Sequence, residues 1–220
     1  MRDPASIREG LRRERAAFAD SLLAAGPDAP TLCEGWRARD LAAHVVVRET
    51  RLDADVSLLL PSFGPAVRRT DQVRDGLRDA TPYAELVRRV RAGSIFIALP
   101  FVERAFNLSE LHVHHEDVRR GAGEADPRRI EPRMATALWR QVRRLAPWSL
   151  RGDRALRVAL RTPGGREVVV HPRGQGPVAS ITGEPLELLL WVFGRGEAAF
   201  VGIEGNPEAR RRLAAAGRRS

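Results

Sequence analysis

The spacing of apolar residues changes near Pro147, and this change constrains the fold more than any other feature of the chain. Between residues 5 and 146, apolar side chains recur every three or four positions, which is typical of amphipathic helices. Residues 156–160 (LRVAL) and 166–171 (REVVVH) instead alternate around the turn TPGGRE, as the two strands of a hairpin do. The sequence therefore predicts a helical part followed by a smaller part that contains a sheet.

Proline and glycine divide the first part into segments of helical length. Gly26 and Pro27 end the first segment, and Pro61 and Gly64 end the second. Helices are expected over residues 5–25, 38–60, 82–93, 101–120 and 131–146. Because helices of this length joined by loops pack as bundles, we predict a mainly α fold that begins with an up-down helical bundle.

The segment after Pro147 has the elements of a small C-terminal α+β domain. Besides the hairpin, the expected elements are strands over residues 177–182 and 198–205 and helices over residues 184–194 and 206–216. The last helix has Asn206 as its N-cap, followed by proline at its first position. The expected domains are a bundle over residues 1–148 and an α+β domain over residues 152–220.

The chain is strongly basic, with a formal net charge of +9 and a pI near 11.3. Such a charge raises nucleic acid as a partner, because clustered basic side chains neutralise phosphates. Here every Lys or Arg position is arginine, which is typical of a GC-rich coding sequence, and the arginines are scattered along the chain. We therefore expect no nucleic-acid partner. The candidate stripe for that alternative combines Arg140, Arg143 and Arg144 with Arg210, Arg211, Arg212, Arg218 and Arg219.

Cysteine usage and hydropathy predict a cytoplasmic protein without a membrane span. Cys33 is the single cysteine, so an intrachain disulfide is excluded and nothing indicates an oxidising compartment. No apolar run approaches the roughly 20 residues of a membrane helix. The charged N-terminal stretch also lacks the apolar core of a signal peptide.

Histidines and carboxylates gather in the expected helix over residues 101–120. His112, His114 and His115 stand there beside Glu110, Glu116 and Asp117. Residues four apart share a helix face, so Glu110 and His114 point the same way, while His112 and His115 are rotated off that face. A Glu and a His on one face supply two ligands of the kind that zinc binds, and leave its coordination incomplete.

His44 is the best candidate for a third ligand. It lies in the middle of an expected helix in an apolar setting (DLAAHVVV), where burying an unpaired imidazole is costly. Facing helices of a bundle commonly combine one or two ligands each into a metal site. The residues alone leave a second interpretation open, in which His44 is a hydrogen-bonded core histidine and HHED is a solvated helix face.

Two segments, TLCEGWRARDLAAHVVVRE and NLSELHVHHEDVRR, resemble the DinB-like superfamily in its mycothiol-dependent maleylpyruvate isomerase branch. The pieces CEGW, VVRE and HHEDVRR are most similar to an uncharacterised actinobacterial metal-binding subgroup. The resemblance covers nearly the whole chain and implies a DinB-like bundle followed by a small α/β domain. It also implies His44, Glu110 and His114 as ligands of a divalent metal, which we expect to be zinc.

The resemblance implies a thiol-dependent isomerase or transferase that acts on a small unsaturated or electrophilic acid. Its partners would be that substrate and mycothiol or another low-molecular-weight thiol. A non-catalytic metal- or ligand-binding module is the first alternative, and arginine-driven nucleic-acid binding is the second. Candidate catalytic residues are Arg48 and Arg51, which could clamp a carboxylate, and Asn107 and Asp117, which could support the ligands.

Three positions depart from the pattern or carry no assigned role. Arg37 stands where the family has Thr or Ser, which removes the expected capping box with Asp40. His112 occupies a position that is apolar or aromatic in the family. Cys33 precedes the helix of His44 and is expected to be a packing thiol, with a reactive thiol as the alternative.

Overall fold

The computed structural model describes residues 4–50, 64–93, 108–124, 126–171 and 173–216. The chain divides into two compact units, Met1–Glu124 and Ala125–Ser220. The first is helical, and the second combines helices with a small sheet. The prediction of a mainly α fold with a C-terminal α+β part is thus confirmed at this level.

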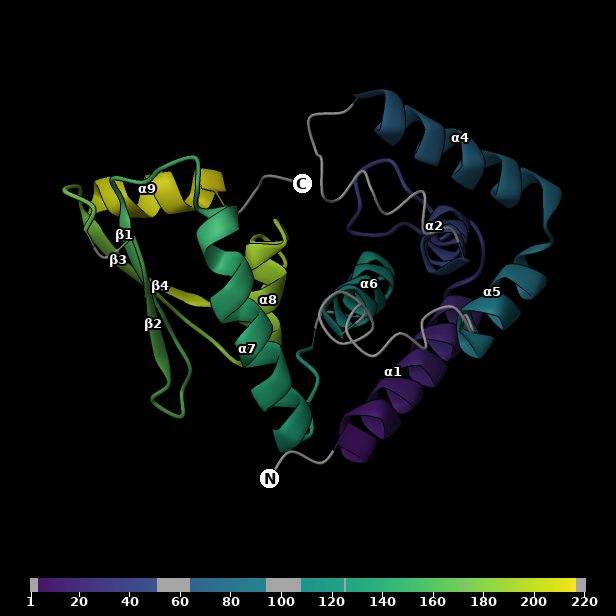
Figure 1. Ribbon diagram of the computed structural model, residues 1–220, viewed down its shortest axis with the longest axis horizontal. Helices are drawn as coiled ribbons and strands as arrows, with labels where there is room; N and C mark the ends of the chain where they lie inside the picture. Colours follow the sequence, from purple (N-terminus) through teal and green to yellow (C-terminus); the bar gives the residue numbers. More distant parts are fainter. Residues whose placement is uncertain (1–3, 51–63, 94–107, 125, 172, 217–220) are drawn as a thin grey trace. The chain divides into compact units, whose positions relative to one another are not determined.

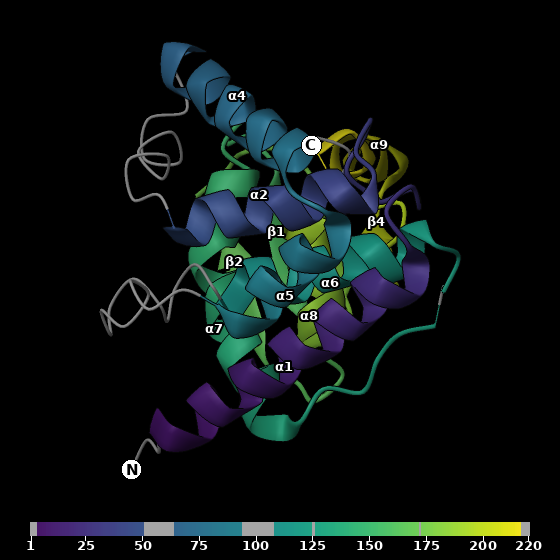
Figure 2. The same ribbon diagram turned by 90° about the vertical axis from the view of Figure 1, so that its right-hand side faces the viewer.

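The described helices of the N-terminal unit pack against α1 and α2 (Figures 1 and 2). They are α1 (Pro4–Ala25), α2 (Ala38–Thr50), α4 (Gly64–Ala80), α5 (Tyr83–Ala92) and α6 (Leu108–Gly121). Helix α1 packs on α6 and α5, while α2 packs on α4 and α5. Figure 1 shows α2 and α6 both nearly end-on, so their axes run in nearly the same direction.

The sequence located most of these helices but did not predict α4. Its segment over residues 64–80 is rich in arginine and aspartate and has few large apolar side chains, so its apolar spacing is a weak signal. The expected extension of α2 to residue 60 lies outside the described residues, as does the expected start of the α6 helix at residue 101.

The core of the N-terminal unit forms where α1, α2, α5 and α6 meet. Phe18 and Leu22 of α1 and Leu41 of α2 are fully buried. Leu86 of α5 and Leu111 of α6 complete this cluster. Burial of apolar side chains is the main stabilising contribution here, since each contributes about 1.5–3 kcal/mol.

Helix α6 is buried on nearly all sides, which corrects the interpretation of HHED as a solvated face. His115 is 3% exposed, and Glu116 and Asp117 are fully buried. Glu116 accepts hydrogen bonds from Arg119 and Arg120 on the following turn. Such burial requires partners for every charge, and α6 supplies several of them itself.

The loop between α1 and α2 lies against the C-terminal end of α6. The backbone N–H of Leu32 donates to the carbonyl oxygen of Asp117 at 3.0 Å. Gly121 permits this approach, because a Cβ atom there would lie 2.4 Å from Cα of Thr31. The loop is thereby held where Cys33 lies beside Asp117.

The C-terminal unit begins earlier than the sequence indicated. Helix α7 (Pro132–Ser149) packs on α8 (Pro185–Val192), so contacts place it with the sheet unit and the division falls at Glu124. The sequence pattern instead predicts that this helix belongs to the bundle, with a boundary between Pro147 and Asp153. Pro147 lies inside α7. The α7 residues Met134, Leu138 and Val142 are buried while the arginines of the same helix are exposed, as expected.

The sheet has the strand order β2-β1-β3-β4. Its strands are β1 (Arg157–Arg161), β2 (Glu167–Val170), β3 (Val178–Thr182) and β4 (Gly202–Gly205), and α9 (Pro207–Ala216) contacts β3 and β4. The predicted hairpin pairs β1 with β2 antiparallel, and β1 pairs with β3 parallel. Asn206 caps α9 by accepting from the N–H of Ala209 at 2.8 Å, as predicted.

Candidate metal centre

Helix α2 carries His44 on the side that faces α6. The N-terminus of α2 is capped, although Arg37 stands where a Thr or Ser was expected. The Asp40 carboxylate accepts from the backbone N–H of Arg37 at 2.8 Å, so half of the expected capping box persists. His44 is half-buried, with its ring 5.1 Å from the ring of Trp36. The guanidinium of Arg74 lies 4.5 Å from the centre of the same Trp36 ring, so Trp36 contacts both His44 and a cation.

Helix α6 contributes Glu110 and His114 to the same place. The rings of His44 and His114 are 5.3 Å apart, nearly perpendicular. One donor atom from each of His44, Glu110 and His114 lies within 4.8 Å of the others. The three residues proposed from the sequence as metal ligands are therefore brought together by α2 and α6.

The two ring nitrogens of His114 have different surroundings. Nδ1 lies 2.9 Å from Oδ2 of Asp117, which is a hydrogen bond. Nε2 is buried and has no hydrogen-bond partner among the described residues; it lies 3.0 Å from Oε2 of Glu110, without hydrogen-bond alignment. A buried polar nitrogen without a hydrogen bond is rare and marks a place where a ligand fits.

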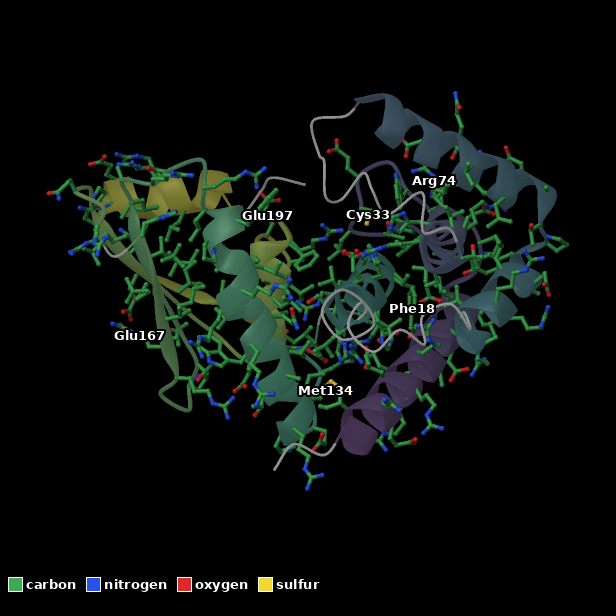
Figure 3. All side chains as sticks on the ribbon, viewed as in Figure 1. Phe18, Cys33, Arg74, Met134, Glu167 and Glu197 are labelled. Atoms are coloured by element: carbon green, nitrogen blue, oxygen red, sulfur yellow. The ribbon has the colours of Figure 1, made fainter. Side chains whose placement is uncertain are left out.

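Cys33 and Asp117 support His114 at Nδ1, the nitrogen opposite Nε2; Figure 3 labels Cys33 in the loop before α2. The Cys33 thiol donates to Oδ2 of Asp117 at 3.2 Å, the same oxygen that contacts His114. A carboxylate on the far nitrogen of a ligand histidine fixes its tautomer and orientation. Asp117 therefore stands where the sequence analysis proposed it, and Cys33 supports it in turn.

The charges of the site prepare His44 and Glu110 for coordination. Burial, followed by the charge of His114, lowers the pKa of His44 to about 3, so its imidazole is neutral at ordinary pH. Burial opposes ionisation of Glu110, but the charge of Arg48 and the contact with His114 outweigh it and hold the pKa of Glu110 well below its usual value. Both groups are thus in the protonation state that binds metal.

His114 carries a proton when no metal is bound. Burial favours its neutral form, but the contacts with Asp117, Cys33 and Glu110 outweigh burial and raise the pKa of His114 well above its ordinary value. A metal ion at this position would replace the proton at Nε2.

These donors fit a divalent metal such as zinc. Two imidazole nitrogens and one carboxylate oxygen are a ligand set of catalytic zinc sites, in which a further position stays open. Donors about 2.1 Å from a tetrahedral ion are about 3.4 Å apart, so side chains within 4.8 Å need only small movements. A second set, Cys33, His114 and Asp117, fits less well, because its atoms already satisfy one another by hydrogen bonds.

Arg48 forms a close ion pair with Oε2 of Glu110. Both side chains are largely buried, with exposed fractions of 15% and 17%. They line a cavity of about 20 Å³ together with Val45, Glu49, Leu111 and His114. That volume holds about one water molecule. The other two catalytic candidates, Arg51 and Asn107, lie outside the described residues.

The side of α6 that faces α1 carries a second network that sequence reasoning missed. His115 Nδ1 lies 2.7 Å from Oε1 of Glu14, and its Nε2 lies 2.9 Å from Oγ of Ser21. Glu14 and His115 are 101 positions apart, so only the fold brings them together. The order Ser21–His115–Glu14 is that of a hydrolase triad, but Ser21 lies inside α1, where helical bonding occupies the backbone N–H groups that an oxyanion hole requires.

The arginine stripe considered for nucleic acid is described only in part. Arg140, Arg143 and Arg144 are exposed on α7, whereas Arg212 of α9 pairs with Asp153 and Glu208. Arg218 and Arg219 lie outside the described residues.

Comparison with known proteins leaves the site to be interpreted from its own geometry. Within the described residues, no helix has both the length and the apolar character needed to cross a membrane. No match to this chain was found among the models of known families, the curated proteins or the solved structures.

Proposed function

We propose that the N-terminal unit binds one divalent metal ion, preferably zinc, through His44, Glu110 and His114, and uses it in a thiol-dependent isomerisation or transfer on a small electrophilic acid. The membership in the DinB-like superfamily that the sequence suggests is part of this proposal. The observation that supports it most is the convergence of one donor atom each from His44, Glu110 and His114 within 4.8 Å of one another. The buried Nε2 of His114 makes no aligned hydrogen bond among the described residues.

Each residue of the site has a separate role in this proposal. His44 and Glu110 provide a neutral nitrogen and an anionic oxygen. Asp117 holds the proton on Nδ1 of His114, so that Nε2 is the nitrogen that gives up its proton to a metal ion. Zinc, when bound, would supply Lewis acidity that favours a thiolate or polarises a carbonyl group. Trp36 contacts the His44 ring and limits its movement.

A non-catalytic metal site is the second candidate, and the size of the cavity favours it. A cavity of about 20 Å³ beside the donors admits a water molecule but no organic acid or thiol. In this alternative the ion only joins α2 to α6 and so stabilises the bundle.

Metal analysis of purified protein tests the proposal. Wild-type protein prepared without chelator or nickel resin should contain about one equivalent of zinc, or take it up when zinc is added. His44→Ala and His114→Ala should each lower zinc affinity at least about a hundredfold, because each removes a coordinating nitrogen.

His115→Ala is the control on the other side of α6, and because it is expected to lower stability, its zinc affinity is measured where circular dichroism shows the variant to be folded. Its zinc affinity should stay within about threefold of the wild-type value. Wild-type protein that binds no zinc would overturn the metal proposal and leave His44 and His114 as core residues. Zinc binding without any thiol-dependent turnover of α,β-unsaturated acids would favour the non-catalytic alternative.

A further inference from the structure

The ion pair between Arg48 and Glu110 occupies the oxygen that a metal ion would use. Arg48 contacts Oε2 of Glu110, and the same oxygen lies 3.0 Å from Nε2 of His114. Without metal, this oxygen is therefore surrounded by a guanidinium and an imidazole. A cation that coordinates Glu110 beside His114 has to compete with Arg48 for it.

The pair also fills the space where a metal-bound ligand would lie. Arg48 lines the small cavity from α2, and Glu110 and His114 line it from α6. The remaining volume of about 20 Å³ is too small for an organic molecule while the guanidinium stays on Glu110. Movement of Arg48 would both release the carboxylate to the ion and enlarge the cavity.

The neighbouring acid does not offer Arg48 an equivalent position. Glu49 is held by Arg15 through two hydrogen bonds, at 2.9 and 2.6 Å. Arg15 also donates to the carbonyl oxygen of Val90, which ties this pair to α5. Glu49 is thus compensated by its own arginine, and a bound divalent ion and Arg48 together would make this side of the site positive.

We propose that Arg48 is a metal-gated carboxylate receptor: it closes the metal-free site by pairing with Glu110, and metal binding transfers it to the carboxylate of a small organic acid. Arg48 is then the residue that selects anionic substrates, because a guanidinium binds a carboxylate through two parallel hydrogen bonds. This inference rests on the proposed function, since it requires that Glu110 bind metal. It also removes the conflict between a water-sized cavity and an organic substrate.

Zinc affinity gives the first test and needs no substrate. Arg48→Gln should bind zinc roughly tenfold more tightly than wild type, the factor expected when one competing charge-assisted hydrogen bond is removed. Arg74→Gln is the matched control, because Arg74 is about as buried, with 13% of its side chain exposed, and lies near His44 while pairing with Asp71 and Asp75. Its zinc affinity should change by less than about threefold.

Binding of fumarate, measured by calorimetry, gives the second test. Zinc-loaded wild-type protein should bind fumarate at least about tenfold more tightly than metal-free protein, and zinc-loaded Arg48→Gln should lose at least about tenfold. Zinc-loaded Arg48→Lys should recover part of the loss, since it keeps the charge but not the paired hydrogen bonds.

The outcomes separate this inference from the metal proposal. If wild-type protein binds no zinc, the metal proposal fails first. If zinc binds but Arg48→Gln binds it equally well or more weakly, Arg48 supports Glu110 instead of competing for it, and the gating inference is wrong. Fumarate binding that is absent from zinc-loaded wild-type protein, or equal in Arg48→Gln, would overturn the role of Arg48 as the carboxylate receptor.

Discussion

The two sides of α6 carry the same kinds of side chain but use them differently. On the side that faces α1, both ring nitrogens of His115 have partners, in Glu14 and Ser21. On the side that faces α2, His114 contacts Asp117 through Nδ1, while Nε2 has no hydrogen bond among the described residues. A buried histidine with two partners stabilises the fold, whereas one with an unsatisfied nitrogen indicates a ligand site.

His112 belongs to the satisfied side. Its Nδ1 lies 2.8 Å from the carbonyl oxygen of Leu108, which can only accept, so the proton is on Nδ1. Its Nε2 lies 3.7 Å from Oε2 of Glu14, beyond hydrogen-bond distance but near enough to interact electrostatically. His112 is thus part of the α1–α6 contact and turned away from the candidate metal site.

His115→Ala should produce the largest effect, a loss of about 3 kcal/mol in the free energy of unfolding of the metal-free protein. The substitution leaves the carboxylate of Glu14, only 9% exposed, without its closest partner and opens a cavity between α1 and α6. Denaturant unfolding followed by circular dichroism measures this change.

His44→Ala is the comparison on the other side of α6. It removes a half-buried ring whose described contacts are the rings of Trp36 and His114, so it should cost only about 1 kcal/mol in metal-free protein. Equal losses in the two variants would contradict the distinction between a structural side and a binding side of α6.

Gly121→Ala should act mainly on the binding side, with a stability loss of about 2 kcal/mol. The added Cβ would lie 2.4 Å from Cα of Thr31 and 2.5 Å from the carbonyl oxygen of Pro30, so the loop before α2 has to move. Cys33 and Asp117 would separate, and zinc affinity should fall about tenfold because His114 loses its support.

Gly76→Ala is the control for Gly121→Ala, since a Cβ at this helical position would meet nothing within 4 Å. It should leave zinc affinity unchanged and stabilise α4 slightly, because alanine has the higher helix propensity. Zinc affinity that stays at the wild-type value in Gly121→Ala would show that the loop does not position His114.

The helical fold could be predicted where apolar spacing is strong, and it was missed where charge dominates. α1, α5 and α7 follow clear stripes and have Pro or Gly near their ends, whereas α4 is built largely of arginine and aspartate. The assignment of α7 to the bundle was also a sequence inference. Its packing on α8 could not be derived from spacing, since an apolar stripe shows that a helix is buried but not which neighbour covers it.

For the candidate site, local spacing located the α6 residues and the resemblance helped to select His44. The pair Glu110 and His114 follows from helix periodicity alone. The partners from distant segments do not: Arg48 on Glu110 and Cys33 on Asp117 depend on how α2 and the preceding loop meet α6. Sequence reasoning therefore proposed the ligand set. It also proposed that Arg48 binds a substrate carboxylate directly, whereas in the structure Arg48 pairs with Glu110.

The pH dependence of zinc binding provides the finest test of the difference between the two sides. The raised pKa of His114 means that zinc must displace one proton at neutral pH, whereas His44, with its pKa near 3, has none to lose above about pH 4. Zinc affinity should therefore rise about tenfold per pH unit up to the pKa of His114 and then level off.

Calorimetry in buffers of different ionisation enthalpy should detect about one proton released per zinc ion. Two independent histidines of ordinary pKa would instead give a hundredfold change per unit below about pH 6. A slope of two would thus show that His44 is protonated in the metal-free protein and that its burial against Trp36 does not prepare it for coordination.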